Sequence, residues 1–198
     1  IPGLIMMTVL QNAFSNTASS LIQSKISGNL VFILLPAIPG PQVAAAYIGA
    51  SFVRSALAGA GLYLLCSWWA SPPVREPGLL IAFGFFGAAI MAALGLITAL
   101  WAEKYDQMGA VMNFVIMPLT FLSGVFYSVD SLPPFWQAAS RLNPFYYLVD
   151  GFRQGFFGSG DTNTTLSLLI VAATALAVTA AYSLNLSLIH ISEPTRLD

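Results

Sequence analysis

Charged side chains are scarce in this sequence. Only 8% of its 198 residues are charged, whereas soluble domains carry roughly a quarter. Hydrophobic residues make up 57% of the chain, and the mean hydropathy is +0.78. This composition excludes an ordinary soluble domain and predicts an all-α integral membrane protein, because a helix satisfies its own backbone hydrogen bonds in lipid. The net charge of −1 argues against nucleic acid as a partner, since phosphate binding requires clustered Lys and Arg.

Residues that carry catalysis are also few. The single cysteine, Cys66, excludes an intrachain disulfide and a cysteine-based zinc site. The single histidine, His190, lies in residues 186–198, which read as a non-native tail and are set aside. No Gly-x-x-x-x-Gly-Lys-Ser/Thr segment is present, so the chain carries no P-loop for a nucleotide. The sequence therefore predicts a protein that is not an enzyme and that holds no cofactor or metal.

Apolar stretches predict a polytopic helical bundle of one partial and four complete spans. The partial span covers residues 1–20 and indicates a fragment truncated at its N-terminus, and a connector follows at 21–41. The complete spans are expected at 43–69, 78–101, 107–127 and 166–184. Arg54, inside the first complete span, is expected to snorkel toward the nearer membrane face. Pro118 should kink the third complete span, because proline removes a helical hydrogen bond.

An aromatic segment at 123–158 is too interrupted to cross a membrane. It carries two proline breaks, which predict two short helices in a re-entrant hairpin at 130–160. Phe145, Val149, Phe152 and Phe156 follow at helical spacing, which predicts an amphipathic helix at the membrane interface with Asp150 and Arg153 paired on another face. The candidate hairpin residues are Pro133, Pro134, Trp136, Arg141, Asn143, Pro144, Asp150, Phe152 and Arg153.

Amides in the spans are candidates for lining a transport path. Asn12 and Asn16 share one helix face by their spacing of four, and Asn113 precedes Pro118 in the kinked span. The alternative interpretation is that these residues serve as hydrogen-bonding contacts between helices. Asp106, Asp130, Asp150 and Asp161 all fall near predicted span ends, and a proton- or sodium-coupled carrier would normally need one in mid-span. Energy for transport is thus expected from a partner at the cytoplasmic face.

Two separated motifs resemble one family. The segment PLTFLSGVFYSVDSLPPFWQAASRLNPFYYLVDGFRQGFFG (118–158) resembles the C-terminal signature of type-2, export-class ABC transporter permeases. The segment PGLIMMTVLQNAFSNTASSLIQSKISGNL (2–30) is similar to the second helix and following cytoplasmic loop of the same family. The resemblance implies six spans in the intact protein, a connector that faces the cytoplasm and a hairpin that faces the outside.

The resemblance also implies partners and a mechanism. Proteins of this family work as a pair of permeases with separate P-loop subunits, which bind ATP and Mg and drive substrate out across the cytoplasmic membrane. On this pattern the connector contacts the ATP-binding subunit through Gln23, Ser24, Lys25, Gly28 and Asn29. A stand-alone secondary carrier or channel is the alternative, and an intramembrane lipid-linked transferase is a third reading. The sequence does not identify the substrate.

Overall fold

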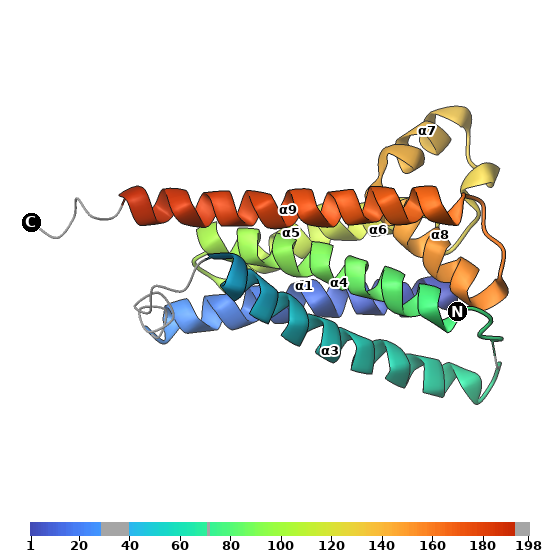
Figure 1. The fold of residues 1–198 in the computed structure, drawn as a ribbon, viewed down its shortest axis with the longest axis horizontal. Helices are drawn as coiled ribbons and strands as arrows, with labels where there is room; N and C mark the ends of the chain where they lie inside the picture. Colours follow the sequence, from blue (N-terminus) through green and yellow to red (C-terminus); the bar gives the residue numbers. More distant parts are fainter. Residues whose placement is uncertain (29–39, 71, 193–198) are drawn as a thin grey trace, which may run out of the picture.

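A bundle of long helices forms the body of the protein (Figure 1). The computed structural model describes residues 1–28, 40–70 and 72–192, and these residues form helices and loops without a strand. The prediction of an all-helical protein is confirmed. The long helices are α1 (Pro2–Ile26), α3 (Gly40–Ser67), α4 (Pro77–Trp101) and α9 (Thr164–Ser192). Helix α9 continues beyond the predicted span end at residue 184, so residues 186–192 are helical.

A fifth path along the bundle is made of shorter helices. It runs through α5 (Tyr105–Val111), a π-helical turn (Met112–Ile116) and α6 (Met117–Leu122) without a break in the chain. The π-helical turn lies directly before Pro118, which has no N–H to donate and so favours a local change of helical register. The kink predicted at Pro118 stays a prediction, and the feature found beside it is this π-helical turn. The helix ends at Leu122, whereas the sequence predicted an end at residue 127.

Three helices are long and apolar enough to cross a membrane, by length and composition. They are Pro41–Ser67, Pro77–Trp101 and Thr164–Asn185, within the described part of the chain. Helix α1 is as long as α4 but contains more polar side chains, and the path from α5 to α6 is divided. The finding agrees with a helical membrane protein, and the number of spans stays a prediction.

Helices α1 and α4 form the centre of the bundle, and small residues let them approach closely. A Cβ atom at Gly95 would lie 2.9 Å from the backbone oxygen of Phe14, and one at Gly87 would lie 2.5 Å from the methyl carbon of Met6. Phe14 and Met6 are both fully buried. Close backbone approach at glycine is a typical source of packing energy between membrane helices.

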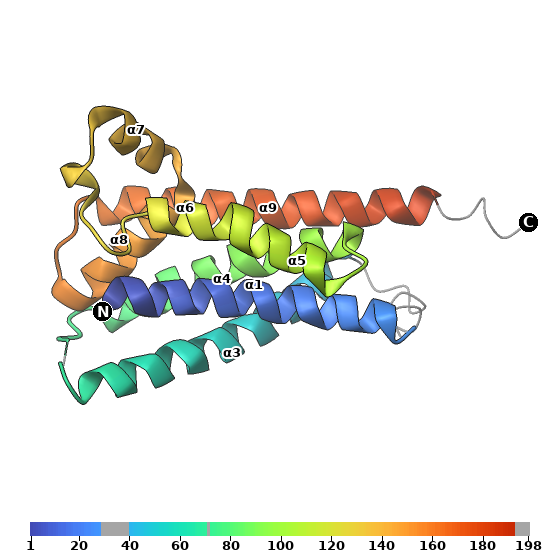
Figure 2. The ribbon, with the colours of Figure 1, turned by 180° about the vertical axis from the view of Figure 1, so that it is seen from behind.

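The two ends of the bundle differ in structure. Figures 1 and 2 place the N-terminus, α7 (Pro134–Leu142) and α8 (Pro144–Phe157) at one end. The C-terminal end of α1 and the start of α3 lie at the opposite end. Helix α7 projects outward, whereas α8 packs among α1, α4 and α9. The bundle therefore separates the predicted coupling residues from the predicted hairpin.

Candidate functional site

The C-terminal end of α1 is tied to the junction between α4 and α5. The Lys25 ammonium donates hydrogen bonds to the backbone oxygens of Leu100 (2.5 Å) and Ala102 (3.3 Å). The Tyr105 hydroxyl donates to the side-chain oxygen of Gln23 (2.5 Å). The last carbonyls of α4 have no partner within their own helix, so a cation at this position supplies the missing hydrogen bonds. Its charge also complements the negative end of the helix dipole. These bonds connect segments about 75 residues apart in the sequence.

Burial lowers the pKa of Lys25, and the carboxylate of Glu103 opposes that change. The ammonium nevertheless has two carbonyl acceptors, which suit its charged form. Lys25 is thus a structural link between helices, and its predicted contact with the ATP-binding subunit stays a prediction.

The predicted connector begins later than expected. Residues 21–26 continue α1, because Leu21 and Ile22 are buried in the core on its apolar face. Ser24 donates to the backbone oxygen of Ser20 in the same helix. Gly28 follows the helix end with φ of +72°, a left-handed conformation that favours glycine. Residues 21–26 are therefore helical, whereas the sequence placed the boundary of the connector at residue 21, and Asn29 with the rest of 29–39 lies outside the described residues.

Each short helix of the aromatic segment starts at a proline. Helix α7 follows Pro133 and α8 follows Asn143, and both have proline as their first residue. The side-chain oxygen of Asn143 accepts from the N–H of Phe145 (3.0 Å), and its NH₂ donates to the backbone oxygen of Leu119 (2.6 Å). Asn143 therefore caps α8 and binds it to α6 at once.

Helix α8 is buried on most of its surface. Gly151 and Gly155 face α4 so closely that a Cβ atom at either position would overlap Phe83 or Leu80. Phe152 is only 6% exposed. The predicted apolar face of this helix is buried against the bundle, because these two small residues let the backbones approach closely, and its place at a membrane interface stays a prediction. Helix α7 is the exposed partner, and its Trp136 is 50% exposed.

Asp150 organises the loop between α8 and α9. Its side chain is buried, and its two oxygens accept from the N–H groups of Asp161 and Thr162 (both 3.0 Å). The Thr162 hydroxyl (2.5 Å) and the Gln154 amide (3.1 Å) donate to the same carboxylate. Four donors around one buried carboxylate make this the most densely bonded polar group of the hairpin region.

Arg153 does not pair with Asp150, contrary to the prediction from their spacing. Its guanidinium lies 3.9 Å from the Asp161 carboxylate and donates to the backbone oxygen of Gly124 (2.8 Å). Asp150 points instead toward the loop, where backbone N–H groups occupy its oxygens. Arg141 pairs with Asp130 at 3.7 Å, and both side chains are more than half exposed.

The predicted path-lining residues do not come together. The Asn12 amide donates to the backbone oxygen of Thr8 in its own helix. Asn16 accepts from the Arg54 guanidinium of α3 (2.6 Å). Asn113 and Pro118 are exposed on the outer surface of the α5–α6 path. Of the four, Asn16 is the one that joins two long helices, and Arg54 turns onto α1 where the sequence predicted that it would snorkel.

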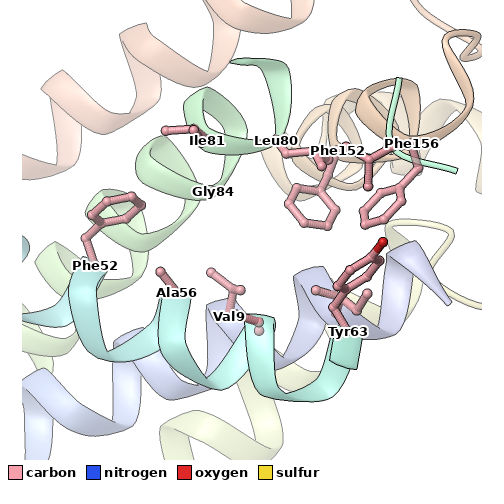
Figure 3. A pocket seen from close by; sticks show the side chains of 13 residues that line it. Val9, Phe52, Ala56, Tyr63, Leu80, Ile81, Gly84, Phe152 and Phe156 are labelled. Atoms are coloured by element: carbon pink, nitrogen blue, oxygen red, sulfur yellow. The ribbon is translucent and has the colours of Figure 1, made fainter. Parts of the chain in front are cut away.

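An apolar cavity of about 310 Å³ lies between α1, α3, α4 and α8. Figure 3 shows Val9 and Phe52 on its walls and a cluster of Tyr63, Phe152 and Phe156 at one end. The Tyr63 and Phe156 ring centroids are 5.9 Å apart. Its walls offer almost no hydrogen-bonding groups, so the cavity suits apolar matter. Among the described residues, no group of three or more His, Cys, Asp or Glu side chains could hold a metal ion.

A family model described as ABC-2 type transporter matches residues 1–157. The chain belongs to this family. The resemblance found in the two sequence motifs is thereby confirmed, and the match includes both the α1 end and the α7–α8 segment.

Several relatives of this ABC-2 permease are known by name. It is 38% identical over 174 residues to the inner membrane transport permease YadH of Escherichia coli K12, covering 86% of this chain and 68% of that protein. It is 31% identical over 119 residues to the capsule polysaccharide export inner-membrane protein BexB of Haemophilus influenzae, covering 57% and 42%. It is 29% identical over 108 residues to the daunorubicin resistance ABC transporter permease protein DrrB1 of Streptomyces coeruleorubidus, covering 54% and 37%.

The ABC-2 permease described here is thus a membrane-spanning subunit of an ABC transporter, located in the inner membrane. The names of its relatives refer to different tasks, capsule polysaccharide export in one and daunorubicin resistance in another. Membership of the ABC-2 family therefore identifies the kind of transporter without identifying its substrate.

Two contacts were not predicted from the sequence. The first is the bond from Arg54 to Asn16, which joins residues 38 apart. The second is the packing of α8 on α4. The spacing of Gly151 and Gly155 is a small-x-x-x-small pattern, and this signal could have predicted that α8 is buried.

Proposed function

We propose that this chain is the permease subunit of an ATP-driven exporter, which moves a substrate out across the cytoplasmic membrane. A separate P-loop subunit hydrolyses ATP, bound with Mg, and a second permease copy completes the pathway. The observation that carries the proposal is the linked end of α1 in a chain of the ABC-2 family that has no P-loop. A separate ATP-binding subunit needs a rigid surface through which it can move the permease helices, and the linked end of α1 provides one.

Force applied at the end of α1 would reach both neighbouring helices. Lys25 connects α1 to the last carbonyls of α4, and Gln23 connects it to the start of α5. Helix α1 has 25 residues, about 38 Å at 1.5 Å per residue, and packs against α4 along the bundle. A push by the ATP-binding subunit on exposed Gln23 and Gly28 is therefore passed along a stiff, tightly packed pair of helices.

The α7–α8 segment is proposed to cap the outer end of the path. It lies at the end of the bundle opposite the C-terminal end of α1, as Figure 1 shows. Asn143 holds α8 to α6, and the Ser140 hydroxyl of α7 donates to the backbone oxygen of Leu122 (2.9 Å). Movement of the α5–α6 path would therefore carry the cap with it.

The second permease copy is expected along the outer face of the α5–α6 path. Phe114 is 82% exposed and Val115 is 51% exposed on this face, beside the exposed amide of Asn113. Membrane lipid or another helix covers such a surface, and an amide within it favours a helix partner.

The test expresses the full-length permease together with the P-loop ATP-binding subunit of the proposed transporter. Stoichiometric co-purification is expected, together with ATP hydrolysis that depends on both chains. Inside-out vesicles should accumulate substrate on adding ATP, and right-side-out vesicles of the same preparation should not. Transport driven by a proton or sodium gradient without ATP would contradict the proposal and would favour the stand-alone carrier.

A further inference from the structure

Arg54 lies at the middle of α3, far from both ends. It follows Gly40 by 14 residues and precedes Ser67 by 13, and the helix has 28 residues, about 42 Å. The hydrocarbon core is about 30 Å thick, so for any placement of α3 across it Arg54 lies about 9 Å or more from the nearer face. A guanidinium at such a depth is costly unless a partner compensates its charge.

The partner that the structure provides is neutral. The guanidinium donates to the side-chain oxygen of Asn16 on α1 at 2.6 Å. The ion pairs found in the described chain are those of Arg141 and Arg153, and Arg54 takes part in neither. Arginine has only donors, so the oxygen of Asn16 must face it and the NH₂ group must point elsewhere. Arg54 is thus held in place, and no described acidic residue pairs with its charge.

A cavity of about 450 Å³ that is open to the surface lies at this contact, between α1 and α3, and Arg54 is exposed on its wall. Beside Arg54 and Asn16 its lining includes Ser20 and Tyr47, with two alanines completing the wall. The guanidinium, the amide NH₂ and two hydroxyls are all groups that can donate hydrogen bonds, and none of the described residues that line the cavity is acidic. A cavity that combines one fixed positive charge with several donors is complementary to an oxyanion.

We propose that this cavity binds the phosphate group of an anionic ligand. Arg54 supplies the charge and the planar fork of donors, and Asn16 is a positioning residue that holds the guanidinium toward the cavity. The phosphate can belong to the headgroup of a membrane lipid or to a soluble phosphate compound, and the two sources share the same recognition chemistry. This site is separate from the linked end of α1 and from the α7–α8 cap.

The experiment titrates the full-length transporter in a neutral detergent and follows binding by calorimetry. The probes are dioctanoyl phosphatidylglycerol, dioctanoyl phosphatidylcholine and inorganic phosphate. The wild type is expected to bind phosphatidylglycerol more tightly than phosphatidylcholine, because choline masks the phosphate charge. Arg54→Gln should weaken phosphatidylglycerol binding about tenfold or more, and Arg54→Lys should weaken it less. Lys104→Gln, a charge removal at the exposed start of α5, is the control and should bind as the wild type does.

A second variant separates binding from folding. Asn16→Asp places a carboxylate against Arg54 and gives the guanidinium an internal counter-ion, so the helices stay joined while the cavity loses its free charge. Phosphatidylglycerol binding should fall about tenfold in Asn16→Asp although its thermal unfolding midpoint is retained. Competition by inorganic phosphate would identify a soluble phosphate as the source, and binding of phosphatidylglycerol alone would identify the lipid headgroup. Wild-type phosphatidylglycerol binding in Arg54→Gln and Asn16→Asp would overturn the proposal, as would the absence of binding by all three probes.

Discussion

Replacing Asp150 by alanine is expected to release the loop between α8 and α9. The carboxylate accepts four hydrogen bonds, from the backbone of Asp161 and Thr162 and from the side chains of Thr162 and Gln154. Asp150 is only 2% exposed, so water does not already compete for these bonds.

The size of the effect follows from the charge of the acceptor. Hydrogen bonds to charged groups are each worth about 1.5–3 kcal/mol, and they are not additive. Water can reach the freed N–H groups, because the bonds are only partly buried on the loop side. We therefore expect Asp150→Ala to lower the free energy of unfolding by about 3 kcal/mol. In Asp150→Asn the amide oxygen can still accept hydrogen bonds, but the NH₂ group faces a backbone N–H and cannot accept from it. We therefore expect Asp150→Asn to lower the free energy of unfolding by about half as much as Asp150→Ala.

The measurement is reversible unfolding of the intact permease in mixed micelles, titrated with a denaturing detergent. Asp130→Ala is the matched control. It is also an Asp→Ala substitution, and it removes the 3.7 Å ion pair between Asp130 and Arg141. The two side chains are 63% and 59% exposed. Exposed pairs are worth about 0–1 kcal/mol, so this variant should unfold nearly as the wild type does.

One result would refute this reasoning. If Asp150→Ala and Asp130→Ala lowered the free energy of unfolding equally, the four bonds would contribute nothing beyond a surface ion pair. Proteolysis within residues 158–163 gives an independent reading, because Asp150→Ala should expose this loop to cleavage and Asp130→Ala should leave it protected.

Three further predictions concern other contacts. Gly151→Ala should destabilise the protein by about 1–3 kcal/mol in the same titration, because the added methyl would overlap Phe83, whereas Gly61→Ala meets nothing within 4 Å and should not. Lys25→Met should reduce transport per ATP hydrolysed by the partner subunit, and equal reductions for Lys104→Met would argue against the α1 link. Burial and the neighbouring Asp150 raise the pKa of Asp161, with Arg153 opposing them. The contribution of Asp161 to the free energy of unfolding is therefore fully present below its ordinary pKa of 3.8 and is lost as the pH rises through the raised pKa. Between these two pH values, the free energy of unfolding of Asp161→Asn should depend less on pH than that of the wild type.

Local sequence predicted the helices and their breaks well where one residue determines the backbone. Proline at the starts of α7 and α8 and Pro118 beside the π-helical turn act through the missing N–H, which needs no distant partner. The pairing of Asp150 with Arg153 failed for the opposite reason. Spacing shows that two side chains on one helix can meet, but backbone N–H groups of a later loop compete for the carboxylate.

The sequence by itself determined that this protein is a helical membrane protein of the ABC-2 family, because composition and two ordered motifs are properties of the chain. Tertiary structure alone decided that Lys25 binds the end of α4, that Arg54 turns onto Asn16, and that α8 enters the bundle. Each of these depends on helices distant in sequence lying side by side. A polar group in a membrane takes the partner that packing brings within reach, and packing is decided by the whole bundle.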